Sequence, residues 1–332
     1  MLMKILTYKH TKYLLFGLIM SLMPTLVSMG HMRNQTLIVL GSVLFYALVA
    51  IGLNVLLGFS GLVSLGTAGF MGLGAYMSAY LTGVLGWQFL LSMAVSTIVP
   101  VLLGVLVGLV SLRVSGMYLA IATLAVAEIF IRMFEQFTDI TGGFSGMRAS
   151  FPSFFGTTLN RGQTFIFIVV VLVIVMILTE NFVRSVTGRA LLTMRASEPA
   201  ASAMGINLLK YKLLAFALAT AYASLGGVLY VHFIQFAFPS DWNLLLALQI
   251  LAVIVIGGLK SIMGAVIGSF VVFGIPQLWL PNLPIIGDIN GLPFIFTGVL
   301  IIVVVLFYPN GLSQVGHDAM KLIRKARHKK EA

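Results

Sequence analysis

The sequence predicts an all-α protein in which a single domain, residues 1–332, crosses a membrane repeatedly. Hydrophobic residues make up 60% of the chain and charged residues 9%, whereas soluble domains carry about 25% charged residues. The apolar residues fall into about ten runs, each near the length of a spanning helix. The net charge of +11 collects at the ends of these runs, which argues against nucleic-acid binding. The absence of cysteine excludes disulfides, thiol catalysis and Cys-ligated metals.

The first apolar run follows three lysines, a pattern that also begins a cleaved signal peptide. It holds Pro24 and ends in Met29-Gly30-His31, without a small-x-small cleavage site, so we expect a retained first span. A spanning helix needs about 20 mostly apolar residues. The ten expected spans lie near residues 13–30, 36–57, 62–82, 88–112, 116–136, 163–180, 213–234, 244–259, 262–280 and 291–308.

The distribution of basic residues predicts that both chain termini lie on the cytoplasmic side. With ten spans, 16 of the 20 Lys and Arg residues fall on the side of the N-terminus, and cytoplasmic loops are enriched in these residues. A first group of spans at 13–180 is then joined to a second group at 213–308 by a cytoplasmic loop at 181–212. The basic tail at 309–332 is expected to lie beside anionic lipid.

Residues 58–74, GFSGLVSLGTAGFMGLG, are rich in glycine and hydroxyl side chains. Two interpretations stay open for this segment. Small residues let helices pack closely. Glycine also lets a helix break, and a broken helix can line a water-filled path in which its free backbone groups meet a substrate.

A weak internal repeat favours the second interpretation. The segment 61–66, GLVSLG, is similar to 258–262, GLKSI, which is followed by Gly264 after one residue. Each segment lies at an inner turn between an inward-running and an outward-running span, so we expect two parallel repeats, a layout known in transporters. Chance similarity between low-complexity segments is the alternative.

The outer side carries two notable loops. The longer one, at 137–162, is rich in Gly, Ser, Thr and aromatic residues. The other, at 281–290, reads PNLPIIGDIN and is stiffened by its prolines. We expect these two loops to close the outer mouth or to receive a partner.

The loop at 181–212 is the most informative segment, because it carries five basic residues and a single acid, Glu198, between apolar spans. Ser197 suits an N-cap, and Glu198 with Pro199 suits a first helical turn. Small residues continue the helix, and Gly205 suits its end. We therefore expect a short, exposed helix whose smooth face fits a partner's cleft. A helix lying on the membrane surface is the alternative.

Several sequence blocks carry a family resemblance, in order, over about residues 36–312. In the loop they are GRALL (188–192), RASEPAA (195–201), AMGIN (203–207) and YKLLAF (211–216). Elsewhere they are GLNVLLGFSG (52–61), SLG (64–66), GLGAY (72–76), GMYLAIATL (116–124), TGG (141–143), AYASLGG (221–227), GGLKS (257–261) with Gly264, and YPNGL (308–312). The chain resembles the permeases of branched-chain amino acid ABC transporters, most of all their LivM-type subunit.

This resemblance implies a multi-pass permease subunit of the bacterial inner membrane that works by alternating access. Its implied partners are a second related permease, two cytosolic ATP-binding subunits and a periplasmic substrate-binding protein, which would dock on the outer loops. The 181–212 loop would hold the coupling helix, with Glu198, Ala200, Ala201 and Gly205 as coupling residues. The general importer pattern places Gly six residues after the Glu. Here Gly205 lies seven residues on, similar to the branched-chain subgroup.

The sequence predicts no enzyme in this chain. It contains no Gly-x-x-x-x-Gly-Lys-Ser/Thr motif, and Gly258-Leu259-Lys260-Ser261 only mimics the end of one. We therefore expect no cofactor here, with ATP and Mg bound by the partner ATPase subunits. The five histidines form no cluster, so no metal site is predicted, and His232 is expected at the membrane interface.

An ion-gradient-driven carrier is the main alternative function. Such a carrier needs titratable groups within the membrane, and the candidates are Glu128 and Glu135. Glu128 lies four residues before Arg132, so a local ion pair competes with a functional role. A non-transporting scaffold is a third possibility, which the glycine-broken spans disfavour.

The candidates for a translocation path are polar side chains on the repeat-bearing spans, together with Glu128. They are Asn54, Ser60, Ser64, Thr67, Glu128 and Gln249. The same side chains suit ordinary hydrogen bonds between helices. Branched-chain or other hydrophobic amino acids are the expected substrates, although members of the family also move urea, short amides and aromatic or other organic acids. The sequence does not decide between these, nor whether the second permease is a copy.

Overall fold

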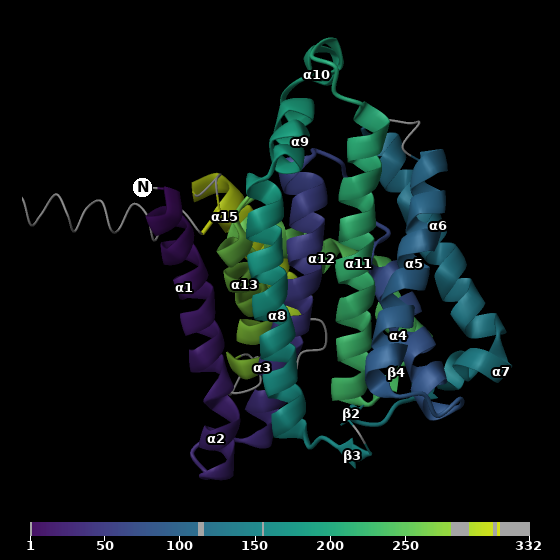
Figure 1. Ribbon diagram of the computed structural model, residues 1–332. Coiled ribbons are helices and arrows are strands. Elements are labelled where there is room, and N and C mark those ends of the chain that lie inside the picture. The colour runs from purple at the N-terminus through teal and green to yellow at the C-terminus, as the bar shows by residue number, and fades with distance from the viewer. Residues whose placement is uncertain (1, 112–115, 155, 280–291, 308–310, 313–332) are drawn as a thin grey trace, which may run out of the picture.

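The computed structural model describes residues 2–111, 116–154, 156–279, 292–307 and 311–312. Most of its helices run side by side through one bundle (Figure 1), which confirms the prediction of a mostly helical, multi-span protein. The α-helices are α1 (Leu2–Ser21), α2 (Met23–Ser28), α3 (Asn34–Leu53), α4 (Thr67–Gly83), α5 (Phe89–Ser111), α6 (Met117–Gln136), α7 (Thr138–Thr141), α8 (Arg161–Arg184), α9 (Val186–Ala196), α10 (Glu198–Ala203), α11 (Leu208–Ile234), α12 (Leu244–Gly257), α13 (Ile262–Ser269), α14 (Ile275–Trp279) and α15 (Leu292–Phe307). The π-helices are η1 (Asn54–Phe59) and η4 (Phe270–Gly274), the 3-10 helices are η2 (Gly143–Ser145) and η3 (Pro239–Trp242), and the strands are β1 (Met147–Arg148), β2 (Ser153–Phe154), β3 (Thr157–Thr158) and β4 (Phe236–Ala237).

Within the described part of the chain, seven helical segments are long and apolar enough to cross a membrane. They are His10–Ser28, Asn34–Phe59, Phe89–Ser111, Met117–Gln136, Arg161–Arg184, Leu208–Ile234 and Ile262–Trp279. A helix also occupies each of the other three predicted spans, but α4, α12 and α15 are shorter, at 17, 14 and 16 residues. The count of ten spans therefore stays a prediction.

The core of the bundle is built on α3 and α11. The spanning window of α3 and η1 is 83% buried, whereas that of α1 and α2 is only 6% buried, which places α1 at the edge. Helix α11 packs against α3, α4 and α5. The helices α5 and α6 lie at the edge opposite α1 (Figure 1).

Two glycines allow α4 and α11 to approach each other closely. A Cβ atom on Gly227 of α11 would lie 1.8 Å from the carbonyl oxygen of Met71, and one on Gly74 of α4 would lie 2.3 Å from that of Ser224. Such distances exclude any side chain, so the two backbones pack in direct contact. This is the small-residue packing expected between membrane helices.

Residues within 58–74 form a turn between two helices, and the broken helix that lines a path stays a prediction. Helix α3 continues as η1 to Phe59, and residues 60–66 are not helical before α4 begins at Thr67. In the second of the two predicted repeats, α12 ends at Gly257, and Gly258 (φ 108°) and Lys260 (φ 67°) turn the chain towards α13. The proposed internal repeat stays a prediction.

The two ends of the bundle are built differently. At one end β1 pairs antiparallel with β4 and β2 pairs with β3, whereas α9 and α10 project from the other end, which also carries the start of α1 (Figure 1). The predicted outer loop 281–290 lies outside the described residues, as does the tail 309–332 except for residues 311–312.

His232 is buried between helices, and its predicted position at the depth of the membrane interface stays a prediction. Only 1% of the residue is exposed. Its Nδ1 atom lies 2.7 Å from the carbonyl oxygen of Ser150, so Nδ1–H is the donor there. Nε2 can then accept from the hydroxyl of Ser78, at 2.9 Å. The ring therefore ties α11 to α4 and to the segment after β1.

The contact between α4 and α11 gives a first prediction. We expect Gly227→Ala to lower the melting temperature of the purified protein by about 5 °C or more, because the added methyl group must push two backbones apart. Thermal unfolding in detergent measures the effect. Gly298→Ala is the matched control, since a Cβ atom there meets nothing within 4 Å. Equal melting temperatures for the two variants would contradict the close approach.

Candidate functional site

The predicted loop 181–212 folds into a compact helical unit at one end of the bundle (Figure 1). Each of its helix starts has a side-chain N-cap. Ser185 accepts from the N–H of Gly188 at 3.4 Å, Ser197 from that of Ala200 at 3.3 Å, and Asn207 from that of Lys210 at 3.1 Å. These caps satisfy backbone donors that the helix starts would otherwise expose.

The short helix α10 begins and ends at the residues that the sequence predicted. Ser197 is its N-cap, and Glu198 and Pro199 form its first turn. Gly205 has φ +79°, and its N–H donates to the carbonyl of Ser202 at 3.0 Å. The N–H of Ile206 donates to the carbonyl of Ala201 at 3.0 Å. The left-handed glycine thus closes the helix and turns the chain back towards α11.

An ion pair fastens α10 to α11. The Nζ atom of Lys212 lies 2.7 Å from Oε1 of Glu198, and 9% of the Lys212 side chain is exposed against 43% of the Glu198 side chain. The ammonium group is therefore largely removed from water and depends on the carboxylate, whereas the carboxylate keeps much of its hydration.

The four predicted coupling residues fall into two sets. Ala201 is fully buried, and Glu198 is held by its ion pair, so these two anchor α10 to its own chain. Ala200 and Gly205 are exposed. The exposed face of α10 continues through Ser202, Ala203 and Met204, and it is this face that is open to a partner.

Arg195, at the end of α9, connects this unit to η1, the continuation of α3. Its guanidinium donates a hydrogen bond to the carbonyl oxygen of Gly58, in η1. Its side chain also lies against Gly61, where a Cβ atom would be 3.1 Å from the Arg195 Cγ. A cation at the carbonyl end of a helix is favourable, because it pairs with groups that lack a helical partner.

Asn54 joins the two glycine-rich turns. Its Oδ1 accepts from the N–H of Lys260 at 2.9 Å, and its Nδ2 donates to the carbonyl of Ser261 at 2.9 Å. The residue is 1% exposed. A Cβ atom on Gly58 would lie 2.1 Å from Oδ1 of Asn54, so glycine at 58 leaves room for this amide.

The remaining predicted path residues are divided between this junction and other parts of the bundle. Ser60 donates its hydroxyl to the carbonyl of Leu56, and Ser64 accepts from the N–H of Gly66 at 3.3 Å. Both are buried, as is Thr67 at the start of α4. Gln249 is half-buried on α12, and Glu128 lies apart from all of them on α6. The role of these residues in a path stays a prediction.

The local ion pair expected for Glu128 is confirmed. Arg132 Nη2 lies 2.9 Å from Glu128 Oε1, and Arg132 Nη1 lies 2.8 Å from Glu135 Oε2. The side chains of Arg132 and Glu128 are 66% and 52% exposed, on the outer surface of the bundle.

Sequence reasoning gave no specific role to Arg195 or Lys212, which hold the unit together. The signal for Lys212 was available, because Glu198 is the only acid among five basic residues in the loop and needed one of them as its partner. No comparable signal existed for Arg195, whose partner is a backbone carbonyl 137 residues away.

Comparison with known proteins identifies a family. The family model "Branched-chain amino acid transport system / permease component" matches residues 35–306. The chain is similar to the high-affinity branched-chain amino acid transport system permease protein LivM of Salmonella typhimurium, with 28% identity over 95% of this chain and 78% of the relative. The LivM protein of Escherichia coli is 27% identical over the same shares. A probable LivM protein of Methanocaldococcus jannaschii is 26% identical over 67% of each chain. No solved structure matches.

The ion pair between α10 and α11 gives a second prediction. We expect Glu198→Gln to raise trypsin cleavage at Arg195 about fivefold, because it leaves the buried ammonium of Lys212 unpaired at a cost of ~1 kcal/mol. Lys212→Met should change cleavage little, since Glu198 remains hydrated without its partner. The double variant should behave like Lys212→Met alone. Peptide mapping by mass spectrometry measures the rates, and equal effects of the two single variants would contradict this asymmetry.

Proposed function

This chain belongs to the family of branched-chain amino acid transport permease components, and on that premise we propose that it forms one membrane-spanning half of an ATP-driven importer. A second, related permease would form the other half, two cytosolic subunits would bind ATP, and a periplasmic binding protein would deliver the substrate. The complex would lie in a bacterial inner membrane. Branched-chain amino acids are the proposed substrates, in line with the names of the relatives.

The proposed topology has ten spans with both termini in the cytosol. Two features support it. The start of α1 lies at the same end of the bundle as α10 (Figure 1). After α15 the N–H of Leu312, the last described residue, donates to the carbonyl of Ile256 at 2.8 Å, near the end of α12 and the turn that Asn54 contacts.

The single observation that carries the proposal is the construction of α10. Its inner residues are fixed to the chain by burial and by an ion pair, while its outer face of small residues is exposed. A helix held in this way can receive a push from a bound subunit and pass it on without bending. The family match covers the same segment.

The hydrogen bonds suggest how movement would spread through the chain. Displacement of α10 reaches α11 through Glu198 and Lys212, and it reaches η1 through α9 and Arg195. Asn54 then ties η1 to the turn before α13. ATP-driven closure of the partner subunits would thus move both glycine-rich turns together, which is what alternating access needs. ATP and Mg would be bound by those subunits, and this chain would transport rather than catalyse.

An ion-gradient-driven carrier is less well supported. Its best candidate for a titratable group inside the membrane was Glu128. That carboxylate is half exposed on the outer surface and paired with Arg132 on the same helix. This ion pair supports an importer over an ion-gradient-driven carrier, because the carboxylate already has a partner on its own helix.

Substitution on the outer face of α10 tests the proposal. Because Ala203 is exposed on α10, we expect Ala203→Arg to abolish co-purification of the ATP-binding subunits and leucine-stimulated ATP hydrolysis. Val186→Arg is the matched control, since Val186 is 68% exposed on α9 but lies outside α10. Pull-down followed by a phosphate-release assay gives both readouts. Retained ATPase binding in Ala203→Arg, or leucine uptake by the lone chain in liposomes, would overturn the proposal.

The contact between Arg195 and η1 gives a fourth prediction. We expect Arg195→Gln to keep the ATP-binding subunits bound but to reduce leucine uptake about tenfold, on the scale of ~1.5 kcal/mol for a hydrogen bond from a charged group. Uptake into proteoliposomes, measured with ATP hydrolysis, separates coupling from docking. Arg189→Gln is the control, because that side chain is exposed on the same helix. Uptake unchanged in Arg195→Gln would show that α9 does not act through η1.

A further inference from the structure

The two edges of the bundle have opposite chemistry. At the α1 edge, the side chains exposed between residues 13 and 24 are apolar: Leu14, Leu15, Leu18, Ile19 and Leu22. At the α6 edge, Glu128 and Arg132 are more than half exposed within a spanning helix. Hydrocarbon suits the first edge but not the second, since charged side chains in a membrane face protein or water.

The charged side chains on α6 form a cluster in which one guanidinium contacts two carboxylates. The guanidinium of Arg132 bridges Glu128, one turn before it, and Glu135, at 2.9 and 2.8 Å. The Glu135 side chain is 14% exposed, so the open part of the cluster consists of one guanidinium and one carboxylate. These are the two groups that complement the carboxylate and the ammonium of a zwitterion.

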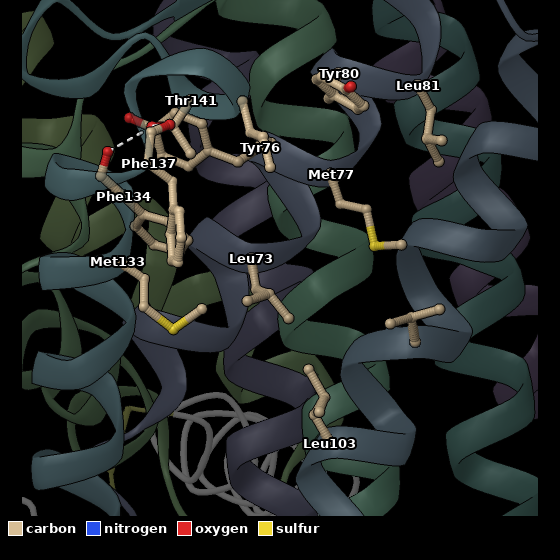
Figure 2. Close-up of a pocket in the computed structure, with 12 residues that line it drawn as sticks. Leu73, Tyr76, Met77, Tyr80, Leu81, Leu103, Met133, Phe134, Phe137 and Thr141 are labelled. Atoms are coloured by element: carbon tan, nitrogen blue, oxygen red, sulfur yellow. Dashed lines mark hydrogen bonds between the residues drawn. The ribbon is translucent and has the colours of Figure 1, made fainter. Parts of the chain in front are cut away.

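An apolar pocket lies directly beside this cluster. It occupies about 510 Å³ between α4, α5 and α6, within the range of about 300–1,000 Å³ typical of small-molecule sites. Its lining includes Leu73, Met77, Leu103 and Met133, which point into a common space (Figure 2). The hydroxyl of Thr141 donates to the carbonyl of Phe134 at 2.6 Å, so it is already occupied.

The pocket and the charged cluster are continuous. Met133 and Phe137 line the pocket, and they also line the shallow groove that holds Glu128 and Arg132. An amino acid with a branched aliphatic side chain carries its ammonium and carboxylate groups on the α-carbon. Its apolar side chain is bonded to the same carbon, so charged and apolar groups lie next to each other. The α6 edge offers both kinds of surface in contact with each other.

We infer that this edge is half of a substrate site, completed by the second permease, which binds a zwitterionic aliphatic amino acid on its way through the membrane. Arg132 keeps its bond to Glu135 and exchanges its bond to Glu128 for one to the α-carboxylate, Glu128 receives the α-ammonium, and the pocket takes the side chain. The inference rests on the proposed function, because the second permease is needed to cover the exposed charges. It adds the position of the path, at α6, and the groups that hold the substrate there.

Cysteine accessibility tests the inference. The chain has no cysteine of its own, so Ile129→Cys, at a position 56% exposed on the charged face of α6, gives a single reactive thiol. A charged methanethiosulfonate reagent reacts with the thiolate, which forms in water and not in lipid. Leu22→Cys is the matched control, because Leu22 is 52% exposed and lies near the outer end of its own span, at the α1 edge.

The complete importer is labelled in lipid nanodiscs, and this chain is analysed by mass spectrometry. We expect the thiol of the Ile129→Cys variant to react at least tenfold faster than that of the Leu22→Cys variant, and excess leucine to slow the faster reaction. Adding Arg132→Gln to Ile129→Cys should keep the reactivity but remove protection by leucine. Adding Arg33→Gln instead, at an exposed arginine just before α3 and outside both predicted outer loops, should keep both.

Two outcomes would overturn the inference. Slow labelling of the Ile129→Cys variant, equal to that of the Leu22→Cys variant, would mean that lipid covers the α6 edge and fills the pocket. Fast labelling without protection by leucine would mean a wet surface that does not hold substrate. Leucine-stimulated ATP hydrolysis is measured in the same nanodiscs. If that activity is present while either outcome occurs, the importer function stands and the α6 site alone is wrong.

Discussion

Where a helix of a membrane protein ends in a buried turn, its last backbone groups need partners within the protein, because lipid offers none. This constraint explains why the two glycine-rich turns lie together. The amide of Asn54 supplies an acceptor for the N–H of Lys260 and a donor for the carbonyl of Ser261. Arg195 takes the carbonyl of Gly58, and the N–H of Leu312 reaches the carbonyl of Ile256. Because each turn is satisfied by residues from a distant part of the chain, the turns, the end of α9 and the segment after α15 form one unit.

Through this unit, the predicted cytoplasmic loop at 181–212 is mechanically connected to the spans. A short exposed helix attached only by its ends could move without disturbing the spans. Here the buried Ala201 and the ion pair of Glu198 with Lys212 fix α10 to α11, and Arg195 fixes α9 to η1. The loop is therefore joined at the same time to α11, the longest helix among the described residues, and to η1. A push on the outer face of α10 has to reach both.

Local rules predicted local structure well. The N-cap at Ser197 and the helix end at Gly205 follow from backbone preferences of single residues, and both are present. The contacts of Asn54 could not be predicted in this way, because its partners are more than 200 residues away. The inward orientation of Ala201 was also out of reach, since six residues of helix are too few to define a buried face. The contacts of His232 could not be predicted for a related reason: its position in the sequence gives its depth along α11 but not which neighbours surround it.

At the edges of the bundle, hydropathy likewise does not predict which side chains of a helix are exposed. Both α1 and α6 pass the length and composition test for a spanning helix, yet only α6 exposes a guanidinium and a carboxylate to its surroundings. Total apolar content measures whether a helix can enter a membrane, whereas the exposed face determines which neighbour it can accept. For α1 lipid is enough. For α6, polar groups of a neighbour or water are needed next to the charges, whereas the adjoining pocket is apolar. Such a surface suits one side of an interface, which is consistent with the proposal that the chain works as part of a larger assembly.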